Sequence, residues 1–274
     1  MNKSIFPLIL SLLIMSTTDA LSQKKAINHV EWKMAAQLQN ADGTTSLGFA
    51  GPINGITKDV LIVSGGANFQ DKMPWEGGKK HYSKEIHVLQ QCNDTYKWNK
   101  NVRSTLPEPI AYCGSTSTDF GVVYVGGENE NGLSNKAFIL QWDAAKSEVK
   151  ATALPNFPVA ITNIGLTHIG NVIFAVGGDT ATASSDQFFS LDLNSTDREW
   201  KTLPKLPIAL ANAVVVVQHK KKETNIYIVG GRTKTPTGIS DLHATTFAFN
   251  IKKQNWESRA NISDGKNTIT FSAG

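Results

Sequence analysis

The stretch Val122-Val123-Tyr124-Val125-Gly126-Gly127 decides the fold of this chain, because its pattern occurs three more times. In each copy a short run rich in β-branched and aromatic residues ends in a glycine pair. The other copies are residues 60–66, 172–178 and 226–231. The second glycines recur roughly every 50 to 60 residues, and a strand repeated at such a period is typical of a repeat architecture. The sequence therefore predicts an all-β fold built from repeated units.

Each repeat continues in the same order after its glycine pair. A third strand follows, and then an outer strand that carries a tryptophan in three repeats, at Trp98, Trp200 and Trp256. This period and pattern are typical of a kelch-type β-propeller, in which every repeat forms a four-stranded blade. Large aromatic residues on outer strands fill the space between neighbouring sheets, so we assign these tryptophans a structural role.

The repeat predicts four complete blades and two leftover strands. The blades are expected at about residues 48–104, 108–153, 158–203 and 208–260. Their inner strands are expected at residues 48–53, 111–116, 161–168 and 211–218. Residues 30–35 resemble an outer strand without a blade, and residues 268–272 resemble an inner strand without a blade. We therefore expect a truncated propeller or a part of a longer chain, the alternative being a four-bladed ring closed by the two leftover strands.

The first residues have the features of a signal peptide. A short positive start precedes an apolar run from Ile5 to Met15, which is too short to span a bilayer, and small residues follow. We expect cleavage near residue 22, a mature kelch domain over residues 23–274, and a periplasmic or secreted protein without a membrane segment. An uncleaved membrane anchor is the alternative.

Composition argues against several other kinds of protein. The chain has 274 residues and a net charge of +4, and its one basic cluster, at residues 220–222, fits a hairpin turn better than a nucleic-acid site. No His, Cys or Asp cluster has metal-ligand spacing, and we expect no cofactor. Export would permit a disulfide between Cys92 and Cys113, but their predicted places in different blades favour two free, buried thiols.

One segment resembles a known family. Gly65-Gly66-Ala67-Asn68-Phe69 and the following Glu76-Gly77-Gly78-Lys79-Lys80-His81-Tyr82 are similar to the sialic acid mutarotase (N-acetylneuraminate epimerase) family, in its cyclically permuted branch. The long loop between them is not part of the generic kelch repeat, which makes the similarity specific. The resemblance implies a six-bladed periplasmic kelch protein, two blades of which would be absent here, and a small acidic sugar as substrate.

The predicted meander indicates where the site would lie. Loops after the second strand of each blade emerge on one face, so they would surround one mouth of the propeller. Mutarotation needs a base for the anomeric hydroxyl and an acid for the ring oxygen. Glu128 directly follows its glycine pair and is the candidate acid/base. A sugar carboxylate would need cations and hydrogen-bond donors, and the candidates for substrate binding are Lys79, Lys80, His81, Tyr82 and Arg232.

The candidate residues and the function also have other interpretations. The family's own acid/base glutamate also follows a glycine pair, but the permutation would place its blade after residue 274, so Glu128 matches the motif and not the blade. Glu128 could instead cap a turn or pair with a lysine, and Arg232 could be a solvated loop residue. His81 and Tyr82 could serve only to close the long loop. A non-catalytic kelch module that binds a glycan or protein is the alternative function, and an open arc with two exposed sheet edges would favour a homodimer.

Overall fold

The computed structural model describes residues 29–40, 42–220 and 223–273 of the chain. The chain divides into two units, residues 1–34 and 35–274, and every strand belongs to the second unit. Its described residues form almost entirely strands and loops, with one 3₁₀ turn, η1 (Pro74–Glu76). No helix in the described ranges is long and apolar enough to cross a membrane. The predicted signal peptide at residues 1–22 lies outside the described residues.

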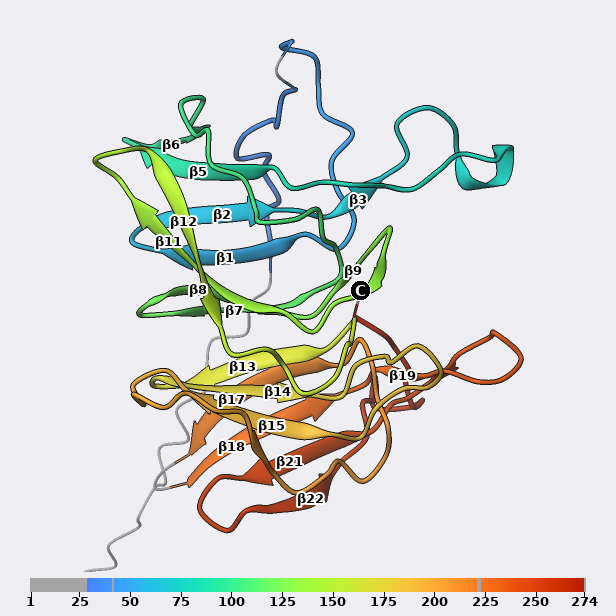
Figure 1. The fold of residues 1–274 in the computed structure, drawn as a ribbon. Coiled ribbons are helices and arrows are strands. Elements are labelled where there is room, and N and C mark those ends of the chain that lie inside the picture. Colours follow the sequence, from blue (N-terminus) through green and yellow to red (C-terminus); the bar gives the residue numbers. More distant parts are fainter. Residues whose placement is uncertain (1–28, 41, 221–222, 274) are drawn as a thin grey trace, which may run out of the picture. The chain divides into compact units, whose positions relative to one another are not determined.

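Within the described residues, most strands form four antiparallel sheets of four strands each, which follow one another in chain order (Figure 1). The six other strands are short and pair into three two-stranded ladders. The first two sheets, from inner to outer strand, are β1 (Ile53–Thr57), β2 (Val60–Ser64), β5 (Ile86–Cys92), β6 (Thr95–Trp98), and β7 (Gly114–Thr118), β8 (Gly121–Val125), β11 (Ala137–Asp143), β12 (Glu148–Leu154). The last two are β13 (Gly165–Ile169), β14 (Val172–Val176), β15 (Phe188–Asp192), β16 (Lys201–Thr202), and β17 (Val214–Lys220), β18 (Glu223–Val229), β21 (Thr246–Asn250), β22 (Asn255–Arg259). The structure confirms the predicted kelch-type blades.

The hydrophobic core consists of three clusters, each lying between two successive sheets. Strand β8 shows why the sheets stack, since all five of its residues are buried and both of its faces pack against neighbours. Trp200 and Trp256 pack into these clusters, and their indole N–H groups donate hydrogen bonds of 3.0 and 2.8 Å to the carbonyls of Pro155 and Pro204. The tryptophans therefore join neighbouring blades, in agreement with the structural role predicted for them.

Each glycine pair is a turn that only glycine can make without strain. Both residues of every pair have positive φ, for example +68° at Gly177 and +94° at Gly178. A side chain at Gly177 would collide with the carbonyl oxygen of Leu210, which is also the acceptor of the Gly178 N–H hydrogen bond, at 2.8 Å. The glycine pairs therefore bring the end of each second strand against the backbone that leads into the next blade.

The inner strands begin later than the sequence predicts. Instead of residues 48–53, 111–116, 161–168 and 211–218, they begin at Ile53, Gly114, Gly165 and Val214. The reason is a bend with positive φ just before each strand, which interrupts the ladder and leaves a single bridge on its other side. The bend residues are Gly51, Tyr112, Asn163 and Asn212, with φ of 59°, 57°, 55° and 50°.

Backbone hydrogen bonds connect these bends from blade to blade. The N–H of Tyr112 donates to the carbonyl of Gly51 at 2.8 Å, and Asn163 donates to Tyr112 at 2.9 Å. Asn212 donates to Asn163 at 3.1 Å, and Ala273 donates to Asn212 at 2.7 Å. We call this series the blade-to-blade ladder. It places one residue of every blade at a fixed distance from its counterpart in the next.

The two predicted leftover strands are not strands. Residues 30–35 pair with no other segment in the described ranges, and Trp32 is 91% exposed. The prediction there is wrong, because alternating apolar residues make a strand only where a neighbouring edge accepts their backbone hydrogen bonds. Residues 268–272 form no ladder either, but the carbonyl of Phe271 accepts the Gly231 N–H hydrogen bond, as Leu210 does for Gly178. This segment thus occupies the position that, after the other blades, leads into the next inner strand.

Both cysteines are free. The thiol of Cys113 donates to the carbonyl of Gly126 at 3.1 Å, and burial raises the pKa of this thiol. Cys92, predicted to be buried, is exposed because it ends β5 at the hairpin that leads into β6. The prediction of two free thiols is therefore confirmed, and the prediction that both are buried is wrong, since Cys92 is exposed and Cys113 is half-buried.

Candidate functional site

The residues that directly follow the four glycine pairs occupy equivalent positions. Each forms a single bridge to the segment before a bend: Ala67 to Ala50, Glu128 to Ala111, Asp179 to Thr162 and Arg232 to Ala211. Three of them begin the short strands β3 (Ala67–Asn68), β9 (Glu128–Asn129) and β19 (Arg232–Thr233), which lie on one side of the sheets (Figure 1). We call the surface made by these four residues and the four bend residues the mouth. A cavity of about 160 Å³ lies beside the bend residues.

Glu128 is held at the mouth by two donors from the long loop of the first blade. Its Oε1 accepts hydrogen bonds from Nζ of Lys80 at 3.2 Å and from the hydroxyl of Tyr82 at 2.9 Å. Lys80 and Tyr82 flank residue 81 where the loop returns as β4 (His81–Tyr82), and side chains two residues apart on a strand share a face. Oε2 makes no hydrogen bond within the described part of the chain, so one oxygen is oriented and the other is available.

Aromatic rings and burial set the protonation of these donors. Nζ of Lys80 lies 4.9 Å from the ring centroid of Tyr112 and 5.6 Å from that of Tyr82. Burial alone lowers the pKa of Lys80, but the hydrogen bond to Glu128 and the nearby Tyr112 outweigh it, so the pKa is raised. Burial and the hydrogen bond to Glu128 raise the pKa of Tyr82. Both groups therefore keep their protons at neutral pH and act as donors to Glu128.

Arg232 belongs to a second charged group at the mouth. Its Nη2 donates to Oδ2 of Asp179 at 2.5 Å, and the Asp179 side chain is completely buried. Oδ2 also accepts from Nδ2 of Asn163 at 3.2 Å, and Oδ1 accepts from the hydroxyl of Ser184 at 2.8 Å. The alternative interpretation of Arg232 as a solvated loop residue is therefore wrong. Asp179 is not among the predicted site residues, although it follows a glycine pair in the same way as Glu128.

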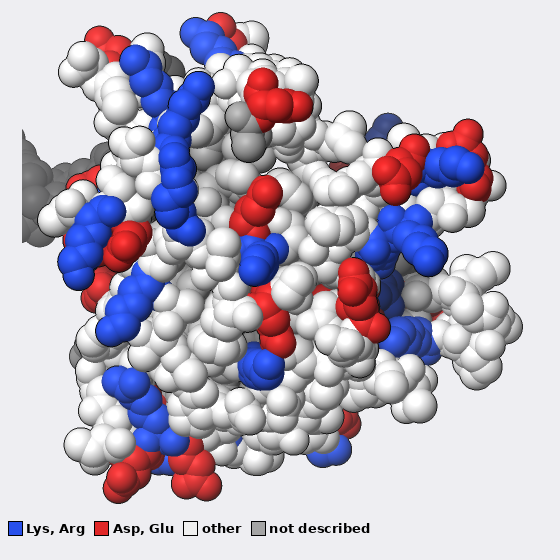
Figure 2. Space-filling view, turned by 45° about the horizontal axis from the view of Figure 1, so that its top comes forward, with Lys and Arg blue, Asp and Glu red and all other residues white. Residues whose placement is uncertain are grey.

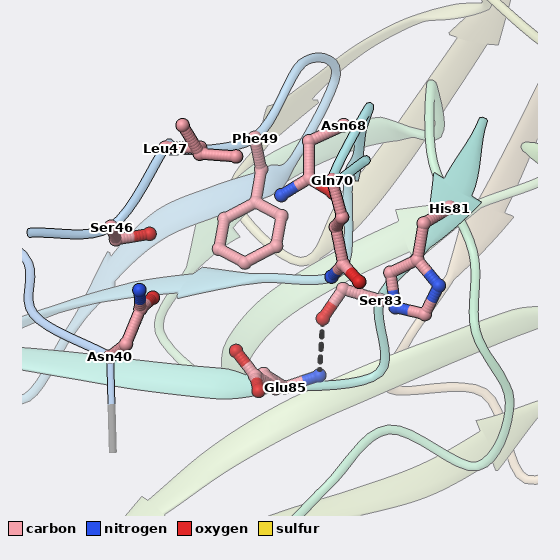
Figure 3. Close-up of a pocket in the computed structure, with 9 residues that line it drawn as sticks. All are labelled: Asn40, Ser46, Leu47, Phe49, Asn68, Gln70, His81, Ser83 and Glu85. Atoms are coloured by element: carbon pink, nitrogen blue, oxygen red, sulfur yellow. Dashed lines mark hydrogen bonds between the residues drawn. The ribbon is translucent and has the colours of Figure 1, made fainter. Parts of the chain in front are cut away.

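Two of the six candidate residues lie elsewhere. His81 points to the opposite face of β4 from its neighbours and lines a separate cavity of about 310 Å³ (Figure 3). Lys79 is exposed and makes no hydrogen bond or ion pair with any described residue. The structure therefore brings Lys80, Tyr82 and Glu128 together, places Arg232 at the mouth beside Asp179, and separates Lys79 and His81 from them.

The distribution of charged side chains and of possible metal ligands limits the chemistry of the site. Figure 2 shows Lys and Arg side chains interspersed with Asp and Glu on the face it displays, without one continuous basic patch. Within the described ranges, no group of three His, Cys, Asp or Glu side chains could hold a metal ion. At the mouth, two hydrogen-bonded carboxylates, those of Glu128 and Asp179, lie with an ammonium, a phenol and a guanidinium. This set is suited to proton transfer on a polar, acidic small molecule.

Comparison with known proteins gives the same family that the long loop resembles. Residues 15–149 match the family model described as N-acetylneuraminate epimerase. N-acetylneuraminate epimerase of Vibrio cholerae serotype O1 is 36% identical over 112 residues, which are 37% of this chain and 28% of that protein. The protein of the same name from Yersinia enterocolitica is 30% identical over 130 residues, 43% of this chain and 31% of that protein. The alignments thus span less than a third of these relatives' length.

A solved structure has the same fold. The protein of the structure titled "Structure of YjhT" superimposes with a TM-score of 0.62, over 78% of this chain and 71% of its own, at 12% sequence identity. At that identity the similarity concerns the fold alone. The matched residues 15–149 include the long loop, Lys80, Tyr82 and Glu128. Residues 15–149 of this chain therefore match the N-acetylneuraminate epimerase family model, and the chain has the kelch-type β-propeller fold.

Proposed function

We propose that this chain is a sugar mutarotase that interconverts the anomers of sialic acid or a related acidic sugar, with Glu128 as its acid/base. The observation that supports this most directly is the position of the Glu128 carboxylate. One oxygen is fixed by Lys80 and Tyr82, and the other has no partner in the described ranges. The names of the family and of the similar proteins support a sialic acid as the substrate.

The proposed reaction opens and recloses the sugar ring. Oε2 of Glu128 removes the proton of the anomeric hydroxyl, the bond from the anomeric carbon to the ring oxygen breaks, and the ring oxygen takes up a proton. We assign this proton to Tyr82, whose hydroxyl donates to Glu128 and is protonated at neutral pH, since its pKa is raised. Rotation about the bond next to the new carbonyl group and the reverse proton transfers close the ring on its other face.

The cations of the mouth account for an acidic substrate. Nζ of Lys80 uses one hydrogen bond on Glu128 and retains further donor capacity. The guanidinium of Arg232 is held by Asp179 through Nη2, and its Nη1 makes only a long contact of 3.5 Å with the hydroxyl of Ser240 among the described residues. The remaining N–H groups of Arg232 can therefore donate hydrogen bonds to a substrate carboxylate. A neutral sugar would form only hydrogen bonds with these cations and no ion pair, so we expect acidic sugars to bind better.

Anomer exchange followed by proton NMR tests this proposal. Full-length protein is added to N-acetylneuraminate that is not at anomeric equilibrium, and the exchange rate is compared with that in buffer. The protein should accelerate exchange, and Glu128→Gln should reduce the acceleration about 100-fold or more. The matched control is Glu130→Gln, which changes an exposed glutamate two residues away and should have no effect. No acceleration by folded wild-type protein would contradict the proposal.

A non-catalytic binding module is the second candidate, and exposed apolar side chains favour it. Trp75 and Ile239 are 80% and 78% exposed on the loops that follow β3 and β19. Each of these side chains presents an apolar surface that a partner could cover. Sugar or protein binding without accelerated exchange would support this candidate over the first.

We also propose that the protein is exported to the periplasm or secreted, on the basis of the apolar run from Ile5 to Met15. The test is the N-terminal sequence of the protein recovered from a Gram-negative host. It should begin after Ala20 or Ser22 in the periplasmic fraction. Recovery of uncleaved protein from the cytoplasm alone would contradict it.

A further inference from the structure

A second cavity, of about 310 Å³, lies beside the ladder between β3 and β4. It is separate from the mouth, because His81 lines it whereas Lys80 and Tyr82, on the other face of β4, contact Glu128. Figure 3 shows that its walls come from three segments: the chain before β1, the end of β3 and the residues that lead from β4 into β5. Nothing in the proposed reaction uses these side chains.

Polar groups dominate the lining. They include three carboxamides, two hydroxyls and an imidazole, contributed by Asn40, Asn68, Gln70, Ser46, Ser83 and His81. Carboxamides and hydroxyls both donate and accept hydrogen bonds, so they match the mixed donors and acceptors of neighbouring hydroxyl groups. The lining therefore suits a ligand rich in hydroxyls.

One acceptor in the lining has no partner. Nδ2 of Asn68 donates to the carbonyl of Gly48 at 3.0 Å, which fixes the orientation of this carboxamide. Its Oδ1 is buried and accepts no hydrogen bond from any described residue. A buried acceptor without a donor costs free energy. A ligand hydroxyl that enters as the neighbouring side chains shift would supply that donor.

Phe49 gives the cavity an apolar wall. The ring of His87 stacks on Phe49 with 5.8 Å between centroids and 29° between planes, and Phe49 also lines the cavity. Sugar rings present C–H groups on one face, and these pack against aromatic rings while the hydroxyls reach polar groups around them. An aromatic ring among carboxamides and hydroxyls is therefore suited to a pyranose ring (Figure 3).

The charge of the lining selects the kind of sugar. Glu85 is charged and none of the nine lining residues is Lys or Arg. Its Oε2 lies 3.3 Å from Nε2 of His87, and burial lowers the pKa of His87, so that imidazole is neutral at neutral pH. An acidic sugar would meet a carboxylate without a compensating cation. We infer that this cavity is a binding site for a neutral pyranose. It is distinct from the mouth, for which we propose an acidic sugar.

Saturation-transfer-difference NMR on the full-length protein tests the inference. The probes are methyl β-D-galactopyranoside and N-acetylglucosamine, with N-acetylneuraminate as the acidic comparison. Gln70 and His81 are exposed lining residues, so Gln70→Ala and His81→Ala should leave the fold intact. Each should weaken binding of at least one neutral probe by about three- to tenfold, the effect of one lost hydrogen bond.

Two control variants distinguish this site from the mouth. Lys79→Ala, which changes an exposed residue outside the lining, and Glu128→Gln should both leave binding of the neutral probes unchanged. The inference is overturned if neither neutral probe receives saturation from folded protein. It is also overturned if Gln70→Ala and His81→Ala have no effect, or if Glu128→Gln abolishes the signal, since the probe would then occupy the mouth.

Discussion

Arg232 donates a hydrogen bond of 2.5 Å to Asp179, whose side chain is completely buried. The two residues follow the glycine pairs of successive blades, so this ion pair joins two blades at the mouth. Asp179 also accepts from Asn163 and Ser184, but neither of these carries a positive charge. Arg232 is therefore the cation that compensates a buried carboxylate, in addition to its proposed contact with substrate.

Arg232→Ala should lower the free energy of unfolding by about 3 kcal/mol, because it leaves the Asp179 carboxylate buried without a cation. Urea denaturation followed by circular dichroism measures this. Arg259→Ala, which removes a partly exposed arginine paired with Glu257, is the control and should cost less than about 1 kcal/mol. Equal losses in the two variants would show that the buried ion pair stabilises the fold no more than the exposed pair does.

Gly177→Ala should destabilise the protein by about 3 kcal/mol, through strain at positive φ and a collision with the carbonyl of Leu210. Gly170 has a φ of +55°, but no atom lies within 4 Å of the place that a β-carbon would take there, so Gly170→Ala should cost only about 1 kcal/mol. The difference between the two thermal midpoints separates the collision from the strain. A larger loss at Gly170 would contradict the proposed packing of the glycine pair.

The pKa of Lys80 should fall in Glu128→Gln, because the carboxylate that raises it is removed while the burial that lowers it remains. In the wild type the folded pKa lies above the ordinary 10.5, so the stabilising contact is fully present below pH 10.5 and is lost as pH rises through the folded value. Side-chain NMR titration of Lys80 measures the pKa. The alkaline loss of stability should be smaller in the variant, and an unchanged lysine pKa would contradict the contact.

Tyr82→Phe should reduce accelerated anomer exchange about 10- to 100-fold while leaving the fold intact, since it removes the hydroxyl that orients Glu128 and supplies a proton. The half-buried position of the ring is retained in the variant. The NMR exchange assay gives the rate, and Tyr96→Phe on an exposed part of β6 is the control. Full activity in Tyr82→Phe would limit this residue to packing the loop.

The two thiols should react at different rates. Cys92 is exposed and should react quickly with Ellman's reagent at pH 8, whereas Cys113 should react only after unfolding, because burial raises its pKa and its thiol is hydrogen-bonded. The expected result is one thiol per native chain and two per denatured chain. If no thiol of the native protein reacts, the two cysteines form a disulfide.

The repeat made much of the fold predictable. A glycine pair ends a strand wherever it closes a β-branched run, because the turn it makes needs positive φ at both residues. The starts of the inner strands were not predictable in the same way. The residue at the bend is Gly51 in one blade, Tyr112 in another and Asn163 in a third, so no common residue type marks it. The bend is maintained by hydrogen bonds between blades, which a local pattern does not contain.

The site was predictable only in part. The family resemblance and the glycine pair singled out Glu128, and the alternation of side chains on a strand accounts for Lys80 and Tyr82 reaching it together. The same alternation turns His81 away, but the strand is two residues long and lies at the end of a long loop, so its position was not evident. The pairing of Arg232 with Asp179 joins residues far apart in sequence and depends on how neighbouring blades pack.

The blade-to-blade ladder uses only main-chain atoms, from Gly51 through to Ala273. Its hydrogen bonds therefore do not involve the side chains at the positions that face the bends. The four positions after the glycine pairs already hold an alanine, a glutamate, an aspartate and an arginine on equivalent backbone. Substitutions at these positions can alter the ligand preference of the chain without altering the spacing of its blades. Specificity and architecture are thus free to diverge separately in proteins built on this frame.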